Sequence, residues 1–463
     1  MIVKQIYTSC LFQGAYYIES NGEAAVIDPL REVSQYIELA ESSNSKIKYI
    51  FETHFHADFI SGHLTLSKKT GAPIIFGPNA KPKFECIIAK DNEKFRIGNI
   101  TITAIHTPGH TLESTCYLLK DENKNEYCLF TGDTLFLGDV GRPDLAQKSQ
   151  NITKEELAGI LFDSVNNKIK PLPGNILIYP AHGAGSACGK NMMKETVDTL
   201  ANQKIINYAL NGSLNKKDFI KELTHELPNP PVYFPSNVKL NQEGYLDFDK
   251  VLEKSLMKLS LDKFKMLMQN DNTVVLDVRN QNSFKQGFVP GSIFIGLSGS
   301  FAPWVGSVIK EIHTKILLIC EKDKEEEAII RLSRVGFDNC IGFLDGGFDV
   351  WKNSDNQFDS VDSISAKDLN KIIGSISLID VRKNGERNNG YLNESVNIPL
   401  DDFKVDILEI DKMDKHFIHC AGGYRSMIAA SLLKRNGFKS IIDVSGGFSA
   451  IRKENFNILE KNV

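Results

Sequence analysis

Four short motifs rich in histidine and aspartate each follow an apolar run in the first half of the chain. They read THFHADF at residues 53–59, HTPGHT at 106–111, TGD at 131–133 and PAHG at 180–183. Each preceding run has the length and apolar content of a buried strand. We therefore expect several strands to end at one rim of the fold and to bring these side chains together there. Histidine and aspartate are common metal ligands, so this rim is a candidate metal site.

Length and composition predict a multidomain globular protein. At about 150 residues per domain, the 463 residues suggest roughly three domains. The contents of 42% hydrophobic and 24% charged residues are usual for a globular protein. A net charge of −4 without a basic block argues against a nucleic-acid partner. We find no apolar run of membrane-spanning length and no signal peptide, so we expect no membrane partner and a cytoplasmic location.

The cysteines indicate thiols and not a disulfide framework. There are eight, far apart and without a CxxC pair, in a chain with no secretion signal. Cys188 stands six residues after His182 in a loop rich in glycine and alanine. We expect Cys188 to be either a catalytic thiol near the metal site or an inert packed side chain.

The second half is an internal duplication with an offset of about 100 residues. Residues 276–279 (LDVR) match 379–382 (IDVR), and 345–348 (DGGF) match 445–448 (SGGF). Each copy alternates short apolar strands with helices, which predicts a parallel α/β sheet. Residues 237–247 are predicted to be rich in turns, and we place the boundary shortly after them. The expected domains are residues 1–258, 259–358 and 359–463.

The loop CAGGYRS at residues 420–426 is the candidate nucleophile site of the second copy. A cysteine between a strand and a helix N-terminus meets backbone N–H groups and the positive end of the helix dipole, which favour a thiolate or persulfide anion. Glycines allow such a loop to curl around the sulfur. We therefore predict Cys420 and Arg425 as catalytic residues, with Gly422, Gly423 and Ser426 binding the substrate.

The first copy keeps a cysteine, Cys320, but lacks the glycines. Its loop reads EKDKEEE at residues 321–327, and Glu325 stands at the position of Arg425. Acidic neighbours raise a thiol pKa and repel an anionic persulfide. We expect this copy to be degenerate, with a structural or docking role.

These motifs carry two family resemblances. The first half resembles the metallo-β-lactamase superfamily, which implies an αββα sandwich with a metal at its edge. The duplicated half, with its DVR and GGF motifs, resembles the rhodanese family. The fold class implied is therefore α/β, an αββα sandwich followed by two rhodanese-like parallel α/β domains.

The resemblance also implies a metal. Superfamily members with two metals usually carry HxHxDH, but Phe59 stands in place of the last histidine, which favours one metal. The segment GDVGRPDL at residues 138–145 resembles the persulfide dioxygenase branch. In that branch one Fe(II) is held by residues that correspond here to His54, His110 and Asp133.

The other polar residues of the motifs have two open interpretations. His56, Asp58 and His182 are expected either to orient the ligands and hydrogen-bond a bound oxygen, or to act as a further ligand or a structural group. Arg142 is either the anchor of a substrate carboxylate or part of a salt bridge.

The resemblance predicts a bifunctional sulfur-detoxifying enzyme. Its front domain would use one Fe(II) to oxidise a thiol persulfide with O2 to sulfite, and Cys420 would transfer sulfane sulfur to give thiosulfate. One alternative is a zinc thioesterase similar to glyoxalase II, fused to a sulfurtransferase. Another is a persulfide sensor or carrier. We also expect self-association into a homo-oligomer.

Overall fold

The computed structural model describes residues 1–145, 151–227, 229–403 and 410–460. Contacts divide the chain into two compact units. The first comprises Met1–Val251 with Lys310–Ile312 and Leu332–Phe337, and the second comprises Leu252–Ile309, His313–Arg331 and Asp338–Val463. Among the described residues, no helix has the length and apolar character needed to cross a bilayer.

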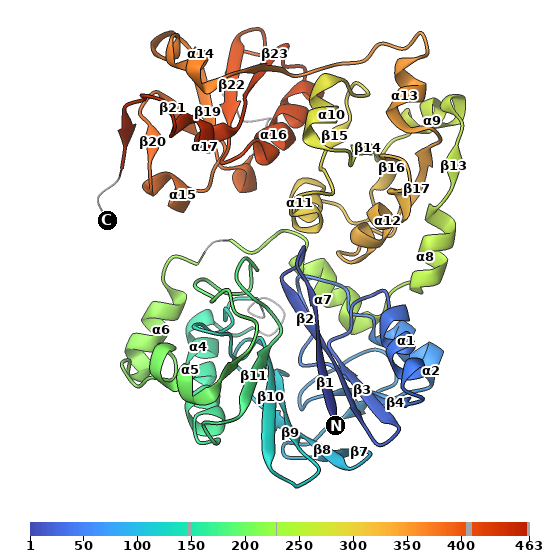
Figure 1. Cartoon of the computed structure of the whole chain (residues 1–463), viewed down its shortest axis with the longest axis vertical. Coiled ribbons are helices and arrows are strands. Elements are labelled where there is room, and N and C mark those ends of the chain that lie inside the picture. The colour runs from blue at the N-terminus through green and yellow to red at the C-terminus, as the bar shows by residue number, and fades with distance from the viewer. Residues whose placement is uncertain (146–150, 228, 404–409, 461–463) are drawn as a thin grey trace. The chain divides into compact units, whose positions relative to one another are not determined.

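The first unit contains two sheets, each with six strands among the described residues (Figure 1). In spatial order the first consists of β1 (Ile2–Thr8), β2 (Gln13–Ser20), β3 (Glu23–Ile27), β4 (Lys46–Phe51), β5 (Ile74–Phe76) and β6 (Ile87–Ile88). The second consists of β12 (Asp198–Thr199), β11 (Leu177–Pro180), β10 (Glu126–Gly132), β9 (Thr115–Lys120), β8 (Ile100–His106) and β7 (Lys94–Ile97). Strands β3 to β6 pair in parallel, and so do β10 and β11. The strands β4, β10 and β11 each end at a loop that carries one of the motifs.

Apolar side chains from both sheets form a shared core, which includes Phe51, Tyr117 and Phe130. Helices cover the outer faces, since buried residues of α1 (Ser34–Ser42) and α2 (His63–Thr70) pack on the first sheet. The second sheet is covered by α4 (Lys154–Ser164), η1 (Val165–Ile169), α5 (Leu200–Ile206) and α6 (Lys216–Thr224). These layers are an αββα sandwich, as the resemblance implied.

One sequence-based expectation is wrong. Residues 237–247 were expected to be turns, but α7 (Phe234–Glu243) occupies most of this segment, and α8 (Phe248–Ser255) follows. Asn241 is buried in α7, where its side-chain amide bonds the backbone of the histidine loop. Tertiary hydrogen bonds therefore override the weak helix propensity of asparagine here.

The second unit contains two parallel sheets with five strands each among the described residues, and the two have the same strand order. The first runs β13 (Lys258–Leu259), β17 (Cys340–Leu344), β16 (Lys315–Ile319), β14 (Thr273–Asp277) and β15 (Ile293–Phe294). The second runs β18 (Asp362–Ile364), β23 (Ser440–Val444), β22 (Lys415–His419), β19 (Ser377–Asp380) and β21 (Ser395–Asn397). The predicted duplication is confirmed.

Short helices alternate with these strands. The first copy has α9 (Leu261–Met268), α10 (Gln281–Gln286), α11 (Phe301–Val308), α12 (Glu325–Ser333) and α13 (Gly347–Lys352). The second has α14 (Ala366–Asn370), η2 (Ile373–Ser375), α15 (Asn384–Asn388), η3 (Leu400–Asp402), α16 (Tyr424–Arg435) and α17 (Gly447–Ile451). It also has a small antiparallel pair, β20 (Tyr391–Leu392) with β24 (Ile458–Leu459).

Candidate metal centre and cysteine loop

His54, His110 and Asp133 come together at the rim of the first unit. His54 follows β4, His110 lies between β8 and β9, and Asp133 follows β10. The Nε2 atoms of His110 and His54 lie 3.5 and 3.9 Å from Oδ2 of Asp133, and all three side chains are buried. The structure therefore gathers the three predicted metal ligands into one group whose donor atoms lie within 4.8 Å of one another.

Hydrogen bonds fix the orientation of both imidazoles. The Thr53 hydroxyl donates to Asp28 Oδ2 at 2.8 Å, so at 3.0 Å it must accept from Nδ1 of His54. Nδ1 of His110 donates to the carbonyl of Arg142 at 2.8 Å. With Nδ1 protonated in both rings, Nε2 is left as the free donor atom, which is the usual arrangement in metal-binding histidines.

The charges of the site also fit a cation. Burial and the neighbouring His56, His110 and His182 lower the pKa of His54 well below its usual value, which favours the neutral form that binds metal. Both carboxylate oxygens of Asp133 are buried and accept no hydrogen bond from the described residues. A buried carboxylate without donors is costly unless a cation neutralises it. The three residues therefore fit a metal ion.

A second group lies on the other side of Asp133. Asp58, His182 and Cys188 are buried, and their potential ligand atoms lie within 4.8 Å of one another. His182 Nε2 is 3.4 Å from Asp58 Oδ2 and 3.5 Å from Asp133 Oδ1. Burial, followed by the Asp58 and Asp133 carboxylates, raises the pKa of the Cys188 thiol well above its usual value. Cys188 thus lies beside the candidate metal group, as one of its two predicted roles requires.

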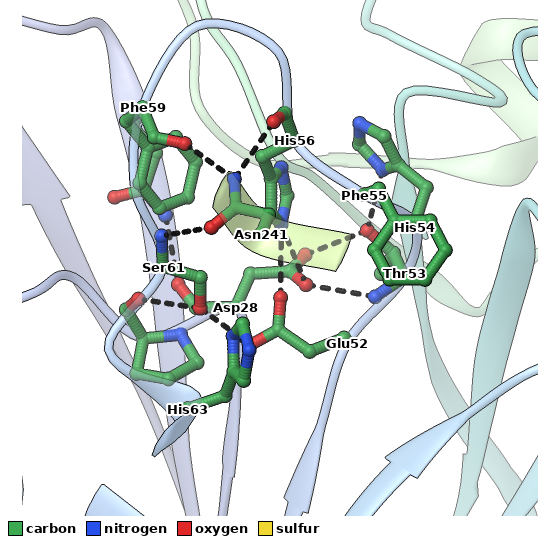
Figure 2. Close-up of polar contacts among 12 residues, drawn as sticks. Asp28, Glu52, Thr53, His54, Phe55, His56, Phe59, Ser61, His63 and Asn241 are labelled. Atoms are coloured by element: carbon green, nitrogen blue, oxygen red, sulfur yellow. Dashed lines mark hydrogen bonds and ion pairs between the residues drawn. The ribbon is translucent and has the colours of Figure 1, made fainter. Parts of the chain in front are cut away.

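His56 belongs to a third group, with Asp28 and Glu52 (Figure 2). Its Nε2 lies 3.0 Å from Asp28 Oδ1 and 3.5 Å from Glu52 Oε2. The two histidines of the HxH motif are therefore directed to different partners, although their ring centroids are only 4.3 Å apart. His56 is not among the potential ligands gathered around Asp133.

Arg142, in the 138–145 segment, is buried. Its guanidinium pairs with both carboxylate oxygens of Asp144, at 2.6 and 2.7 Å, and donates to the carbonyl of Ala187 at 3.2 Å. Its backbone N–H donates to the carbonyl of Cys188 at 3.0 Å. Hydrogen bonds of Arg142 thus connect the 138–145 segment with the Cys188 loop. Binding of a substrate carboxylate by Arg142 stays a prediction.

In the second unit, Cys420 directly follows β22, and α16 begins four residues later. Gly423 has a φ of 107°, a left-handed conformation that favours glycine, and its N–H donates to Cys420 Sγ at 3.1 Å. The thiol is therefore at the N-terminal end of a twelve-residue helix and already accepts one backbone N–H. Cys420 therefore has the two features that the sequence predicted for its surroundings, a backbone N–H donor and a helix N-terminus.

The other predicted residues of this loop are placed as follows. Arg425 forms a bidentate ion pair with Glu386 at 2.6 and 2.7 Å, so its position is fixed. The buried Ser426 hydroxyl donates to Asp443 at 2.7 Å. That hydroxyl is committed to Asp443, and substrate binding by Ser426 stays a prediction. Gly422 lies beside Gly423, and a Cβ at either position would meet no atom within 4 Å.

Cys320 has a different environment. It directly follows β16 as Cys420 follows β22, but α12 has Glu325, Glu326 and Glu327 in its first turn. Burial, and then the Glu325 carboxylate, raise the pKa of Cys320 well above its usual value. These acids also oppose the anion-stabilising effect of the helix N-terminus. The surroundings of Cys320 are therefore unsuited to a persulfide anion.

Sequence reasoning missed several residues that support these sites. Glu52, His63 and Asn241 organise the histidine loop, and Glu386 fixes Arg425. One signal was present, because Glu52 is a charged residue directly after the apolar run that ends at Phe51. Such a residue is buried only with partners.

Family models match most of the chain. The model described as the metallo-beta-lactamase superfamily matches residues 9–184, and the rhodanese-like domain model matches residues 260–354 and 365–454. The two rhodanese matches coincide with the two copies of the duplication.

Similar proteins include enzymes of two kinds. A probable hydroxyacylglutathione hydrolase of Schizosaccharomyces pombe is 34% identical over 168 residues, which are 35% of this chain and 60% of that protein. The mitochondrial persulfide dioxygenase ETHE1 of Mus musculus is 28% identical over 247 residues, which are 52% of this chain and 88% of that protein.

A solved structure extends the similarity beyond the first domain. It is a metallo-beta-lactamase from Staphylococcus aureus, 32% identical, with a TM-score of 0.64. The match covers 74% of this chain and 98% of that chain. The protein therefore belongs to the metallo-beta-lactamase superfamily and carries rhodanese-like domains after its metallo-beta-lactamase domain.

Proposed function

We propose that this protein is a persulfide dioxygenase with a linked sulfurtransferase. The first domain converts a thiol persulfide, O2 and water into a thiol and sulfite: R-S-SH + O2 + H2O gives R-SH + SO3²⁻ + 2 H⁺. The terminal sulfur is oxidised, O2 is reduced, and the S–S bond breaks. The similarity to the persulfide dioxygenase of Mus musculus supports this reaction.

The observation that carries the proposal is the set of three buried donors at His54, His110 and Asp133. Two histidines and one carboxylate suit Fe(II), which supplies open positions where O2 and a sulfur ligand can bind together. Thr53 and the Arg142 carbonyl hold the two imidazoles in the ligating tautomer.

The residues beside this group have proposed roles toward the substrate. His182 lies 3.5 Å from one oxygen of Asp133 and 3.4 Å from Asp58, and we assign His182 and Asp58 hydrogen bonds to a bound oxygen or water. Cys188 lies with them, and we assign it a contact with the persulfide sulfur. Arg142 is proposed to bind a carboxylate of the thiol carrier. These roles predict changes in KM more than in metal content for Cys188→Ala and Arg142→Lys.

The last domain would handle the sulfane sulfur. The Cys420 thiolate attacks the outer sulfur of a persulfide and releases the thiol, leaving Cys-S-S⁻. Sulfite then attacks the outer sulfur, so thiosulfate leaves and the thiolate is restored. The Gly423 N–H and the α16 N-terminus stabilise both anions, and Arg425 contributes positive charge held in place by Glu386.

Iron-loaded protein, prepared without oxygen, tests both halves. With a panel of low-mass thiol persulfides, we expect O2 uptake and thiosulfate formation. Cys420→Ser should keep the O2 uptake and yield sulfite in place of thiosulfate, and Cys320→Ser is the matched control that should change neither. Loss of O2 uptake in folded Cys420→Ser protein would contradict this division of labour.

A zinc thioesterase is the second candidate, because the similarity to hydroxyacylglutathione hydrolases is also present. The second group at Asp58, His182 and Cys188 gives it a possible site for a second metal. Phe59 argues against this second metal, because a fully buried phenyl ring stands where a ligand of that metal would be needed. Thioester cleavage by the zinc-loaded protein, without O2 uptake by the iron-loaded protein, would establish the hydrolase instead.

A further inference from the structure

The backbone donor to the Cys420 thiol lies in an open part of the cysteine loop. Cys420 itself is anchored within its own copy, because its carbonyl accepts the Phe448 N–H at 2.7 Å. At Gly422 and Gly423, in contrast, an added Cβ would meet no atom within 4 Å. The Gly423 N–H, which donates to Cys420 Sγ at 3.1 Å, therefore depends for its position on its neighbours in the chain, and the next residue is Tyr424.

Tyr424 is held by the first, degenerate copy. Its hydroxyl donates to the carbonyl of Gly296 at 2.6 Å, and its ring centroid lies 5.8 Å from that of Phe294. The ring also lies directly on Gly299, where an added Cβ would come within 2.3–2.6 Å of three ring carbons. Because carbon atoms in contact are about 3.5–4.0 Å apart, only a glycine leaves room for the ring at this position.

The rest of α16 continues this contact. The buried Ser431 hydroxyl oxygen accepts the N–H of Phe294 at 3.0 Å, and the Arg435 guanidinium donates to the carbonyl of Gly291. Phe294 belongs to β15, which lies at the edge of its sheet among the described strands. Positions 424, 431 and 435 share one face of an α-helix. The helix that begins at the cysteine loop thus rests with one face on an edge strand of the degenerate copy.

The first copy has no counterpart of this anchor among its described residues. With Glu325 at the position of Arg425, Lys324 stands at the position of Tyr424. The Lys324 side chain is 50% exposed and pairs with Glu327 of α12 at 2.9 Å. The anchored aromatic ring is therefore present in the copy whose loop has the glycines and is replaced in the copy whose loop has the acids.

We propose that Tyr424 is a positioning residue through which the degenerate copy holds the Gly423 N–H and the N-terminus of α16 against Cys420. The degenerate copy thus serves the chemistry of the other copy, although its own cysteine is unsuited to a persulfide. A donor that is fixed in advance stabilises a sulfur anion better than one that must first be ordered. This inference rests on the proposed sulfur transfer at Cys420.

Amide hydrogen exchange of the full chain, followed by mass spectrometry, tests the anchor itself. Tyr424→Phe removes only the hydroxyl and should speed exchange in residues 420–426 by about three- to tenfold, the change expected from the loss of one hydrogen bond. Gly299→Ala displaces the ring and should speed it further. Gly374→Ala is the matched control, because its Cβ would meet no atom within 4 Å. Exchange in β19 should stay unchanged in all three variants.

Sulfur transfer from thiosulfate to cyanide tests the effect on the chemistry and needs neither iron nor O2. The Cys420 thiolate takes the sulfane sulfur and releases sulfite, and cyanide then removes that sulfur as thiocyanate. Gly299→Ala should lower kcat by about 10- to 100-fold, since misplacing a reacting group by about 1 Å can cost a factor of about 100. The KM for thiosulfate should change little, because the lost interaction acts on the transition state. Gly374→Ala should leave both constants unchanged.

Faster exchange throughout the second copy would show a merely structural role and overturn the inference, as would wild-type exchange and kcat in folded Gly299→Ala protein. If Gly299→Ala does not fold, Tyr424→Phe alone decides, with a smaller change in the same direction. Absence of sulfur transfer in the wild type, with the local exchange results intact, would reject the proposed function and leave the anchoring of the loop by the degenerate copy standing.

Discussion

Replacing Thr53 with valine tests how the metal-binding histidine is oriented. Thr53 is buried, and its hydroxyl connects Asp28 Oδ2, at 2.8 Å, with Nδ1 of His54, at 3.0 Å. Valine has nearly the same shape, so packing should be kept while both hydrogen bonds are lost. The Thr53 backbone N–H still donates to Asp28, so the carboxylate is not left without a donor.

Two effects of different size are expected from this change. Loss of a buried hydrogen bond to a charged group costs about 1.5–3 kcal/mol, so the free energy of unfolding of the metal-free protein should fall by about 2 kcal/mol. Without a partner for Nδ1, the His54 ring is no longer restricted to the ligating tautomer. Metal affinity should then fall by about 10- to 100-fold, or about 1.4–2.8 kcal/mol.

Competition with a chromophoric chelator measures the affinity, and urea unfolding of the metal-free protein measures the stability. Thr53→Ser keeps the hydroxyl and should retain affinity within about threefold of the wild type. If folded Thr53→Val protein binds Co(II) or Zn(II) as tightly as the wild type, the Thr53 contact does not orient His54, and the assignment of Nε2 as the donor loses its support.

Three further changes test other parts of the molecule. Asn241→Leu removes three hydrogen bonds to the histidine loop and should lower the free energy of unfolding by about 2–4 kcal/mol. Asn237→Leu is the control, because Asn237 lies in the same helix but has no side-chain hydrogen bond among the described residues, and its replacement should be nearly neutral or stabilising. Thermal denaturation of the two variants compares these effects. Arg382→Lys and Arg279→Lys should each lower the free energy of unfolding, measured in urea, by about 2–4 kcal/mol. Lysine cannot replace a buried guanidinium that pairs with both an aspartate and a backbone carbonyl. A loss of stability in only one copy would contradict the equivalence of the two arginines. Burial lowers the pKa of His419 to about 4, so the unfolded chain binds a proton that the folded chain does not between about pH 6.5 and 4. His419 should therefore reduce stability by about 3 kcal/mol as pH falls through that window, and the urea midpoint of His419→Asn should be less sensitive to pH than that of the wild type.

The fold could be predicted because its signals are local or repeated. The apolar run at residues 100–105 corresponds to β8 (Ile100–His106), and the run at 127–130 to β10 (Glu126–Gly132). The duplication was visible as paired DVR and GGF motifs, and the structure repeats the strand order around them. The order of the motifs also predicted that His54, His110 and Asp133 would lie close together, since each follows or adjoins a strand end.

The direction of individual side chains could not be predicted in the same way. His54 and His56 are two residues apart in a loop, and their spacing does not say which partner each ring will face. Their directions are set by Asp28, which lies 25 residues before Thr53 in the chain, and by Asn241, which lies 185 residues after His56. Such partners follow from tertiary packing, and no local pattern around residues 54–56 contains them.

Comparison of the two rhodanese-like copies separates the residues that maintain the fold from those that carry the chemistry. In each copy the arginine of DVR pairs with its aspartate and a glycine carbonyl, and it stacks on the phenylalanine of GGF: Arg279 on Phe348 and Arg382 on Phe448. These contacts are the same whether the following cysteine loop has glycines or acids, so DVR and GGF maintain the sheet and its last helix. The copies differ where a persulfide would sit, because Cys420 has the Gly423 N–H and Cys320 has Glu325 nearby. A match to the rhodanese family therefore predicts the fold of both copies, while the capacity for sulfur transfer has to be judged from the cysteine loop alone.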